Sequence, residues 1–335
     1  MKIACLFLVA TAALQAAVDG MVLNGTTGRP QAGVPVTLVS VSGAGMQPQG
    51  STTSDPAGRF RFSETLQGPS LLQASYQGVT YNLMVQPAAS TGLTLQIYGA
   101  SATPGEAKPV EDVVLLEPLG TELSVRETVI WRNGGKQTFH DPAGGTLRFY
   151  APPEAKDTLR VSATAPGGLP LEQAAAPAGT RDVFKVDFAI KPGDTTFEIS
   201  YRLPFSSPGS FSGRVVQKDT PLRLAVPAGV TLEGDGLELI GQEPQSQASI
   251  YSVKTAEYKV VLAGTGSIAA APAGGAQDTG SGIDQILPRV YGSVYAIVGL
   301  AMVILALGFI LLYRRKAPAS ASAPDAASPR GRTRR

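Results

Sequence analysis

The sequence contains one long uncharged stretch that limits where the rest of the chain can fold. From Val290 to Tyr313 no residue carries a charge, and three basic residues follow at once. At about 1.5 Å per residue, a helix over this stretch spans roughly 36 Å, more than the ~30 Å of a bilayer's hydrocarbon core. Basic flanks stay on the cytoplasmic side. The sequence therefore predicts a transmembrane helix at 290–313 and a basic, disordered cytoplasmic tail at 314–335.

The N-terminus has the pattern of a secretory signal peptide. Lys2 precedes an apolar run from Ile3 to Leu14, which is followed by small residues. This order is typical of a signal peptide over residues 1–17. The alternative is an uncleaved anchor, for which the run is short. Cys5, the sole cysteine, lies inside this segment, so the mature chain has no disulfide and no thiolate metal site.

Charge and length restrict the kind of protein. The chain has 335 residues and a net charge of +2, and the tail holds most of the excess basic charge. The remainder is mildly acidic, which disfavours nucleic acid as a partner. The part between the two apolar segments is long enough for two or three domains. Its Gly, Pro and Ala content and simple envelope topology favour a bacterial source.

The first part of that region has short β-rich runs separated by turn residues. Val34, Val36 and Leu38 alternate along one face, as a half-buried strand requires. The segments 24–28 and 55–58 combine Asn, Asp and Gly in the way that tight turns do. Asn24 also begins a glycosylation acceptor pattern, although the turn role explains it better.

Several of these residues resemble one family. Gly20-Met21-Val22, Gly28-Arg29-Pro30, the run Gly33 to Leu38, Thr53, Asp55, and Gly58-Arg59-Phe60-Arg61-Phe62 follow its order and spacing. This pattern is similar to the carboxypeptidase regulatory-like domain, a transthyretin-like β-sandwich, and it covers residues 18–88 only. The resemblance implies an accessory module that carries no catalytic residues. A sandwich at 18–98 is therefore expected.

A second β-sandwich, of the immunoglobulin or fibronectin type, is expected at 110–205 after a Gly/Pro-containing linker. Apolar residues alternate over 184–190 and again over 197–203, and Pro192-Gly193-Asp194 separates the two runs. These runs predict an antiparallel hairpin with one apolar face. Residues 123–131 predict an earlier strand, in which Glu127 points the wrong way unless a bulge or a sheet edge intervenes.

The third segment is ambiguous. Residues 206–263 contain further strand patterns that predict either a small third β-domain or the completion of the second, and we favour a third domain. Residues 264–288 are rich in Gly, Ala, Ser and Thr, which predicts a flexible stalk.

The sequence offers few residues for chemistry. His140 is the only histidine, so a zinc site with two histidines and a glutamate is excluded, and no nucleophile elbow accompanies it for a serine triad. Glu111-Asp112 and the acidic pair at 233–235 lack calcium-loop spacing, and they are interpreted as turns or solvated loops. Trp131 and the Phe149-Tyr150 pair are interpreted as core. We therefore predict no catalytic residues, no cofactor-binding residues, no metal site and no cofactor.

Together these patterns predict an all-β protein with tandem β-sandwich domains on a single C-terminal transmembrane helix. It is expected to be a non-enzymatic envelope protein with its bulk in the periplasm or at the cell surface and its C-terminus in the cytoplasm. Its expected partners are the lipid bilayer and an envelope protein or a glycan. A more specific form of this expectation is an accessory subunit of a membrane complex. The alternatives are a single-pass receptor-like protein and an unrecognised hydrolase.

Overall fold

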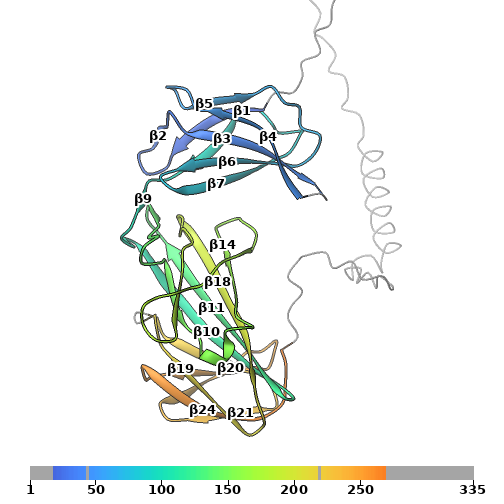
Figure 1. Cartoon of the computed structure of the whole chain (residues 1–335), viewed down its shortest axis with the longest axis vertical. Coiled ribbons are helices and arrows are strands. Elements are labelled where there is room, and N and C mark those ends of the chain that lie inside the picture. Colours follow the sequence, from blue (N-terminus) through green and yellow to red (C-terminus); the bar gives the residue numbers. More distant parts are fainter. Residues whose placement is uncertain (1–17, 43–44, 218–219, 269–335) are drawn as a thin grey trace, which may run out of the picture. The chain divides into compact units, whose positions relative to one another are not determined.

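The fold is all-β over the residues that can be described. The computed structural model describes residues 18–42, 45–217 and 220–268, which fall within one compact unit, residues 1–271 (Figure 1). Apart from a single 3-10 turn, η1 (Pro153–Ala155), the regular elements of these residues are strands. No helix among them is long and apolar enough to cross a membrane. The predicted signal peptide, transmembrane span, tail and most of the stalk lie outside the described residues.

The N-terminal part consists of two four-stranded sheets that enclose one apolar core. One sheet contains β1 (Val18–Asn24), β2 (Arg29–Pro30), β5 (Arg59–Phe62) and β8 (Leu93–Ile97). The other has the order β4 (Gly45–Thr53), β3 (Pro35–Ser42), β6 (Ser70–Tyr76) and β7 (Val79–Val85). The alternation predicted from the sequence is confirmed, because Val34, Val36 and Leu38 are buried with Phe60 and Phe62.

The two predicted turns are also confirmed. The Asn24 carbonyl accepts a hydrogen bond from the Gly28 amide at 2.8 Å, and the Asp55 carbonyl accepts one from the Gly58 amide at 2.8 Å. Gly58 has a φ of 75°, and a Cβ there would lie 2.9 Å from the Val22 carbonyl oxygen, so the turn requires glycine. Asn24 is buried and its side-chain amide donates to Gln31, which supports the turn role over glycosylation.

The second part is built around one long sheet. Its eight strands have the order β15 (Leu171–Glu172), β14 (Arg160–Thr164), β18 (Gly193–Pro204), β11 (Glu122–Asn133), β10 (Ala107–Leu119), β20 (Leu222–Val226), β23 (Ser249–Val253) and β22 (Leu237–Gln242). We call the three-stranded sheet of β19 (Gly209–Arg214), β24 (Glu257–Gly264) and β21 (Val230–Gly234) the cover sheet. Another three strands pair in the order β13 (Leu147–Tyr150), β17 (Val183–Val186) and β16 (Ala176–Pro177).

These sheets share a single core. One continuous cluster of buried side chains runs from Ala107 to Leu262 and includes residues of the long sheet, the cover sheet and β13. Because β20, β22 and β23 are hydrogen-bonded into the sheet of β10 and β11, residues 206–263 share both a sheet and a core with residues 107–205.

The hairpin predicted between residues 184–190 and 197–203 is wrong. β17 pairs with β13 and β16, whereas β18 pairs with β11 and β14. Between them, Ile190 exchanges backbone hydrogen bonds with Phe139 at 3.0 and 2.9 Å, so the chain changes sheets before β18 begins. Alternation shows that each run is a strand, but it carries no information about the partner.

The two parts meet through a small set of polar contacts. β9 (Ala100–Ser101) pairs in parallel with β12 (Thr138–Phe139). The Tyr81 hydroxyl lies 2.8 Å from the hydroxyl of fully buried Thr138 and donates to the Tyr98 carbonyl at 2.8 Å. Lys191 donates to the Thr80 carbonyl at 2.6 Å, and its ammonium lies 5.0 Å from the centre of the Tyr81 ring. Tyr81 therefore contacts residues of both parts at this junction.

Replacing Tyr81 with Phe should lower the free energy of unfolding by about 1–3 kcal/mol, because the buried Thr138 hydroxyl loses its partner. Chemical denaturation of the two proteins measures the difference. Tyr251→Phe is the control, since Tyr251 is also a half-buried tyrosine packed against the core and its hydroxyl forms no hydrogen bond with the described residues. An equal loss in both variants would contradict the role of the junction.

Candidate functional site

Two adjacent strands place a pair of acidic side chains inside the second part. Asp112 on β10 lies opposite Val129 of β11, and Val114 lies opposite Glu127. Asp112 and Glu127 are therefore diagonal neighbours on one face of the sheet, within side-chain reach. We call these two residues the carboxyl pair. The face they share is the core face, because Val114, Val125 and Val129 of the same face are all buried.

Asp112 differs from what the sequence indicated, whereas Glu127 points inward as the alternation implied. Asp112 is only 2% exposed, so the interpretation of Glu111-Asp112 as a solvated loop is wrong for Asp112. Glu127 follows the inward alternation of β11 without a bulge at that point, and the register shift of this hairpin lies instead between Pro109 and Glu111. The signal that could have identified the pair is an acid at an inward position of each of two consecutive strands.

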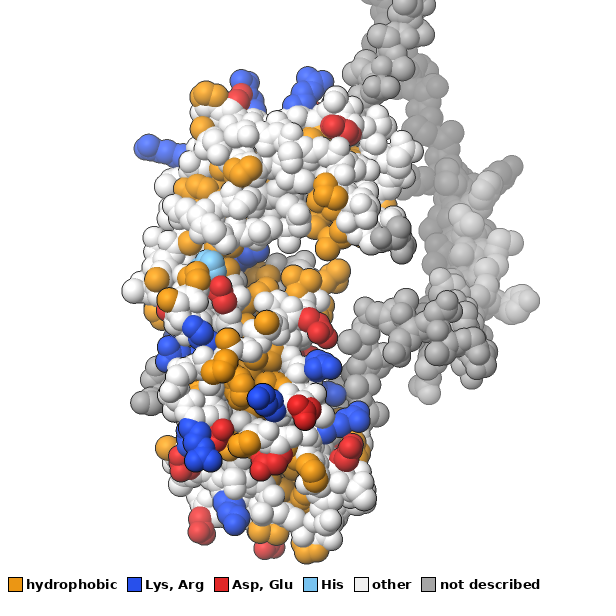
Figure 2. Space-filling view, in the orientation of Figure 1, with side chains coloured by type: hydrophobic (Ala, Val, Ile, Leu, Met, Phe, Trp, Pro, Cys, Tyr) orange, Lys and Arg blue, Asp and Glu red, His pale blue; other side chains and the backbone are white. Residues whose placement is uncertain are grey.

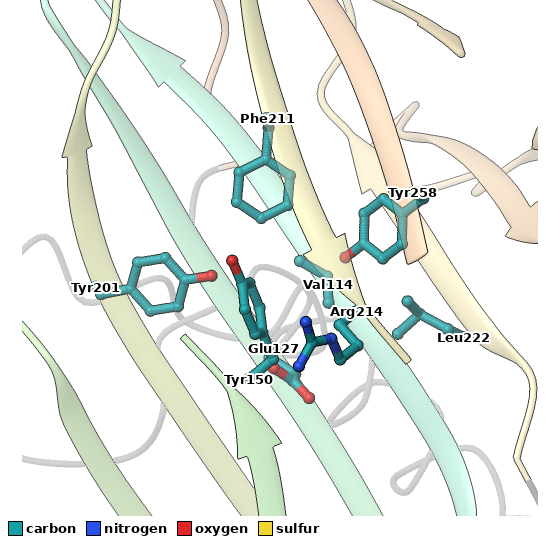
Figure 3. A pocket seen from close by; sticks show the side chains of 8 residues that line it. All are labelled: Val114, Glu127, Tyr150, Tyr201, Phe211, Arg214, Leu222 and Tyr258. Carbon is teal, nitrogen blue, oxygen red and sulfur yellow. The ribbon is translucent and has the colours of Figure 1, made fainter. Parts of the chain in front are cut away.

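Glu127 lines a small cavity between the long sheet, the cover sheet and β13 (Figure 3). The space that a water centre can occupy there is about 10 Å³, enough for a single water molecule. Three tyrosines and one arginine contribute the other polar groups, and the remaining wall is apolar. The lining residues are Val114, Glu127, Tyr150, Tyr201, Phe211, Arg214, Leu222 and Tyr258.

Each tyrosine comes from a different strand. Tyr201 on β18 and Tyr258 on β24 are almost fully buried, and Tyr150 on β13 is half-buried. Tyr258 lies directly opposite Gly213 of β19, and a Cβ on Gly213 would lie 2.2 Å from the Tyr258 hydroxyl. The missing side chain of Gly213 therefore makes room for this ring.

The only guanidinium that lines the cavity is already engaged. Arg214 donates from Nε to the Glu257 carboxylate at 3.0 Å, and its guanidinium carbon lies 5.6 Å from the centre of the Tyr150 ring. The Asp112 Oδ1 atom is buried without a hydrogen-bond partner among the described residues. Among the residues that the structure describes, no cation therefore forms a direct ion pair with Asp112 or Glu127.

Burial consequently favours the protonated acids. It raises the pKa of Asp112 to about 7, and it raises the pKa of Glu127 well above its usual range, with a further contribution from neighbouring Asp112. Burial also raises the pKa of Tyr201 and Tyr258, and the charge of Glu127 adds to both shifts. Near neutral pH the pair can therefore hold at least one proton.

The other residues considered from the sequence lie elsewhere. His140 is half-buried at the end of β12, where its Nε2 lies 2.9 Å from the Asp187 carboxylate. Asp141 to Gly145 form a tight turn closed by a 2.8 Å backbone hydrogen bond. Trp131 and Phe149 are in the core as expected, whereas Tyr150 lines the cavity. No cluster of three or more potential metal ligands occurs among the residues that the structure describes.

A second candidate feature is the exposed edge of the long sheet at β22. Leu239 is 59% and Ile240 58% exposed. Glu127, Val114, Leu224, Tyr251 and Leu239 form one cross-strand row from β11 to β22. Side chains in such a row lie on the same face of a sheet. Leu239 thus continues the core face beyond the part that the cover sheet buries.

Comparison with known proteins gives no assignment: the sequence matches no protein-family profile and no curated protein. The function must therefore be inferred from the features described above.

Gly213→Ala should destabilise the protein by about 1–3 kcal/mol, because the new methyl group displaces the buried Tyr258 ring from the cavity wall. Thermal or chemical unfolding measures this effect. Gly68→Ala is the matched control, since no atom lies within 4 Å of a Cβ there and its φ is not positive. A Gly213→Ala protein as stable as the control would contradict the tight packing of Tyr258.

Proposed function

We propose that this protein is a non-enzymatic, membrane-anchored envelope protein whose β-domains outside the cytoplasm bind or hold a protein or glycan partner. The apolar stretch at 290–313 and the signal-like segment at 1–17 support the topology. The resemblance of residues 18–88 to the carboxypeptidase regulatory-like domain supports an accessory role for the first sandwich. An accessory subunit of a membrane complex is the specific form of this proposal.

The exposed edge strand β22 is the observation that carries the proposal. Edge strands present unpaired backbone groups, and soluble proteins usually protect them with charges, prolines or very short strands. β4, the edge of the N-terminal sheet, contains Pro48 in this way. β22 carries Glu238 and a bulge at Ile240, yet it still exposes both Leu239 and Ile240, which suits the addition of a strand from a partner.

Acidic residues outnumber basic ones in the sequence near this edge, which favours a basic partner segment. From Arg223 to Lys254 the chain has four acidic and two basic residues. Glu238 on β22 pairs with Lys254 at 3.1 Å, and the Glu243 carboxylate accepts hydrogen bonds from Ser246 that lower its pKa. On the face shown in Figure 2, basic and acidic side chains of the second part are interspersed.

Changing Leu239 and Ile240 together to Lys should reduce recovery of cross-linked partners of the full-length protein at least about tenfold, since a binding edge would lose its apolar contacts. Quantitative mass spectrometry after cross-linking in membranes gives the measurement. Met84→Lys, at another half-exposed apolar position on a sheet edge, should leave recovery unchanged.

Deletion of residues 18–268 separates this proposal from a role of the anchor alone. Partners that depend on the β-domains disappear with them, whereas partners bound only through residues 290–335 remain. Recovery of every partner after the deletion would refute the proposed role of the ectodomain.

A further inference from the structure

We propose that the carboxyl pair is a proton-binding site that fastens the cover sheet to the β10–β11 hairpin when protonated and loosens it when the proton leaves. The proposal concerns the fold of the ectodomain, and it does not depend on which partner binds. The step is a simple dissociation: a carboxyl O–H bond breaks, the electron pair stays on the carboxylate, and the proton goes to solvent.

The geometry makes the pair sensitive to the position of the cover sheet. Asp112 and Glu127 lie on the hairpin, whereas Phe211, Arg214 and Tyr258 of the cavity wall belong to the cover sheet. When these elements are packed, the Asp112 Oδ1 atom has no partner among the described residues. If the cover sheet moves away, water reaches both carboxyls and solvates their charges, so the charged pair favours the open arrangement.

The groups that face the pair do not compensate for a negative charge. Tyr201 faces it from β18, Tyr150 from β13 and Tyr258 from β24. All three are neutral near pH 7, since the pKa of a tyrosine, about 10 in water, is raised further by burial. Arg214 on β19 is held by Glu257 of β24. Beyond Tyr150 lie two more acids, Asp182 and Glu154, whose charges further raise the pKa of that tyrosine.

The direction of the pH effect follows from these shifts. Both acids have a higher pKa in the packed state than in water, so the packed state binds protons more tightly. The resulting stabilisation is complete below about pH 4 and is lost as the pH rises through about 7, where Asp112 ionises. Packing of the cover sheet should therefore weaken from mildly acidic to mildly alkaline conditions.

Hydrogen exchange of backbone amides in the full-length protein, in detergent micelles, tests the proposal. Between about pH 5.5 and about pH 8.5, the opening constant of β19 and β24 should rise by about thirtyfold after correction for intrinsic exchange, as the Asp112 shift requires. The strands β3 and β6 of the N-terminal part serve as the internal reference and should not change.

Variants assign the effect to the pair. The double change Asp112→Asn and Glu127→Gln, or Asp112→Asn alone if the double variant does not fold, should remove or reduce the pH dependence. Asp194→Asn, which removes an exposed acid paired with Arg132 at 2.8 Å, should retain it. An unchanged dependence in the double variant, or its absence in the natural protein, would overturn the proposal.

A bound metal cation is the alternative to a bound proton, because two carboxylates without a basic partner could also hold a cation. The exchange measurement at about pH 8.5 is therefore repeated with millimolar calcium and with a chelator. Equal exchange in both supports a proton site, whereas protection restored by calcium would show that the pair binds a metal ion and would refute the proton proposal.

Discussion

The register of the β10–β11 hairpin is the constraint on which the second part depends. Its ladder is continuous from Val114 opposite Glu127 to Leu119 opposite Glu122, and β18 extends it on the other side of β11. Because side chains alternate between faces, this register sends Leu123, Val125 and Val129 into the core and takes Glu127 with them. A shift by one residue would expose the carboxyl, but it would also expose every apolar side chain of the strand. The burial of these neighbours therefore outweighs the cost of partly burying one acid.

The surroundings of Glu127 reduce the free-energy cost of placing its carboxyl group on the core face. Protonation removes the charge, and a single water fits in the cavity beside the tyrosine hydroxyls. The opening left by Gly213 lets Tyr258 reach the cavity from the opposite sheet. The same arrangement makes the site sensitive to pH. A negative charge on the carboxyl pair is stable in water, but it has no direct ion-pair partner among the described residues once the cover sheet is in place.

The sequence predicted local structure better than it predicted the long-range pairing of strands. The strands at Val36 and Phe60, and the turns at Asn24 and Asp55, follow from alternation and turn chemistry, which act between residues close in the chain. The strand that pairs with β18 cannot be predicted in this way, because a strand with one apolar face can pair with any other such strand. The parallel insertion of β20 beside β10 joins residues more than a hundred positions apart, and no local pattern indicates it. The carboxyl pair was missed for the same reason: Asp112 was assigned to a loop before its strand partner was known.

The row of side chains from Glu127 to Leu239 connects the carboxyl pair with the exposed edge strand β22. It begins under the cover sheet, passes through buried Val114 and Leu224, and ends at an exposed leucine on β22. The apolar area available at the edge is therefore set by how much of this row the cover sheet buries. If deprotonation loosens the cover sheet, more of the row becomes accessible, and a partner bound along it stabilises the ionised form of the pair. By linkage, such a partner must then lower the proton affinity of the site by the same factor by which deprotonation strengthens its own binding.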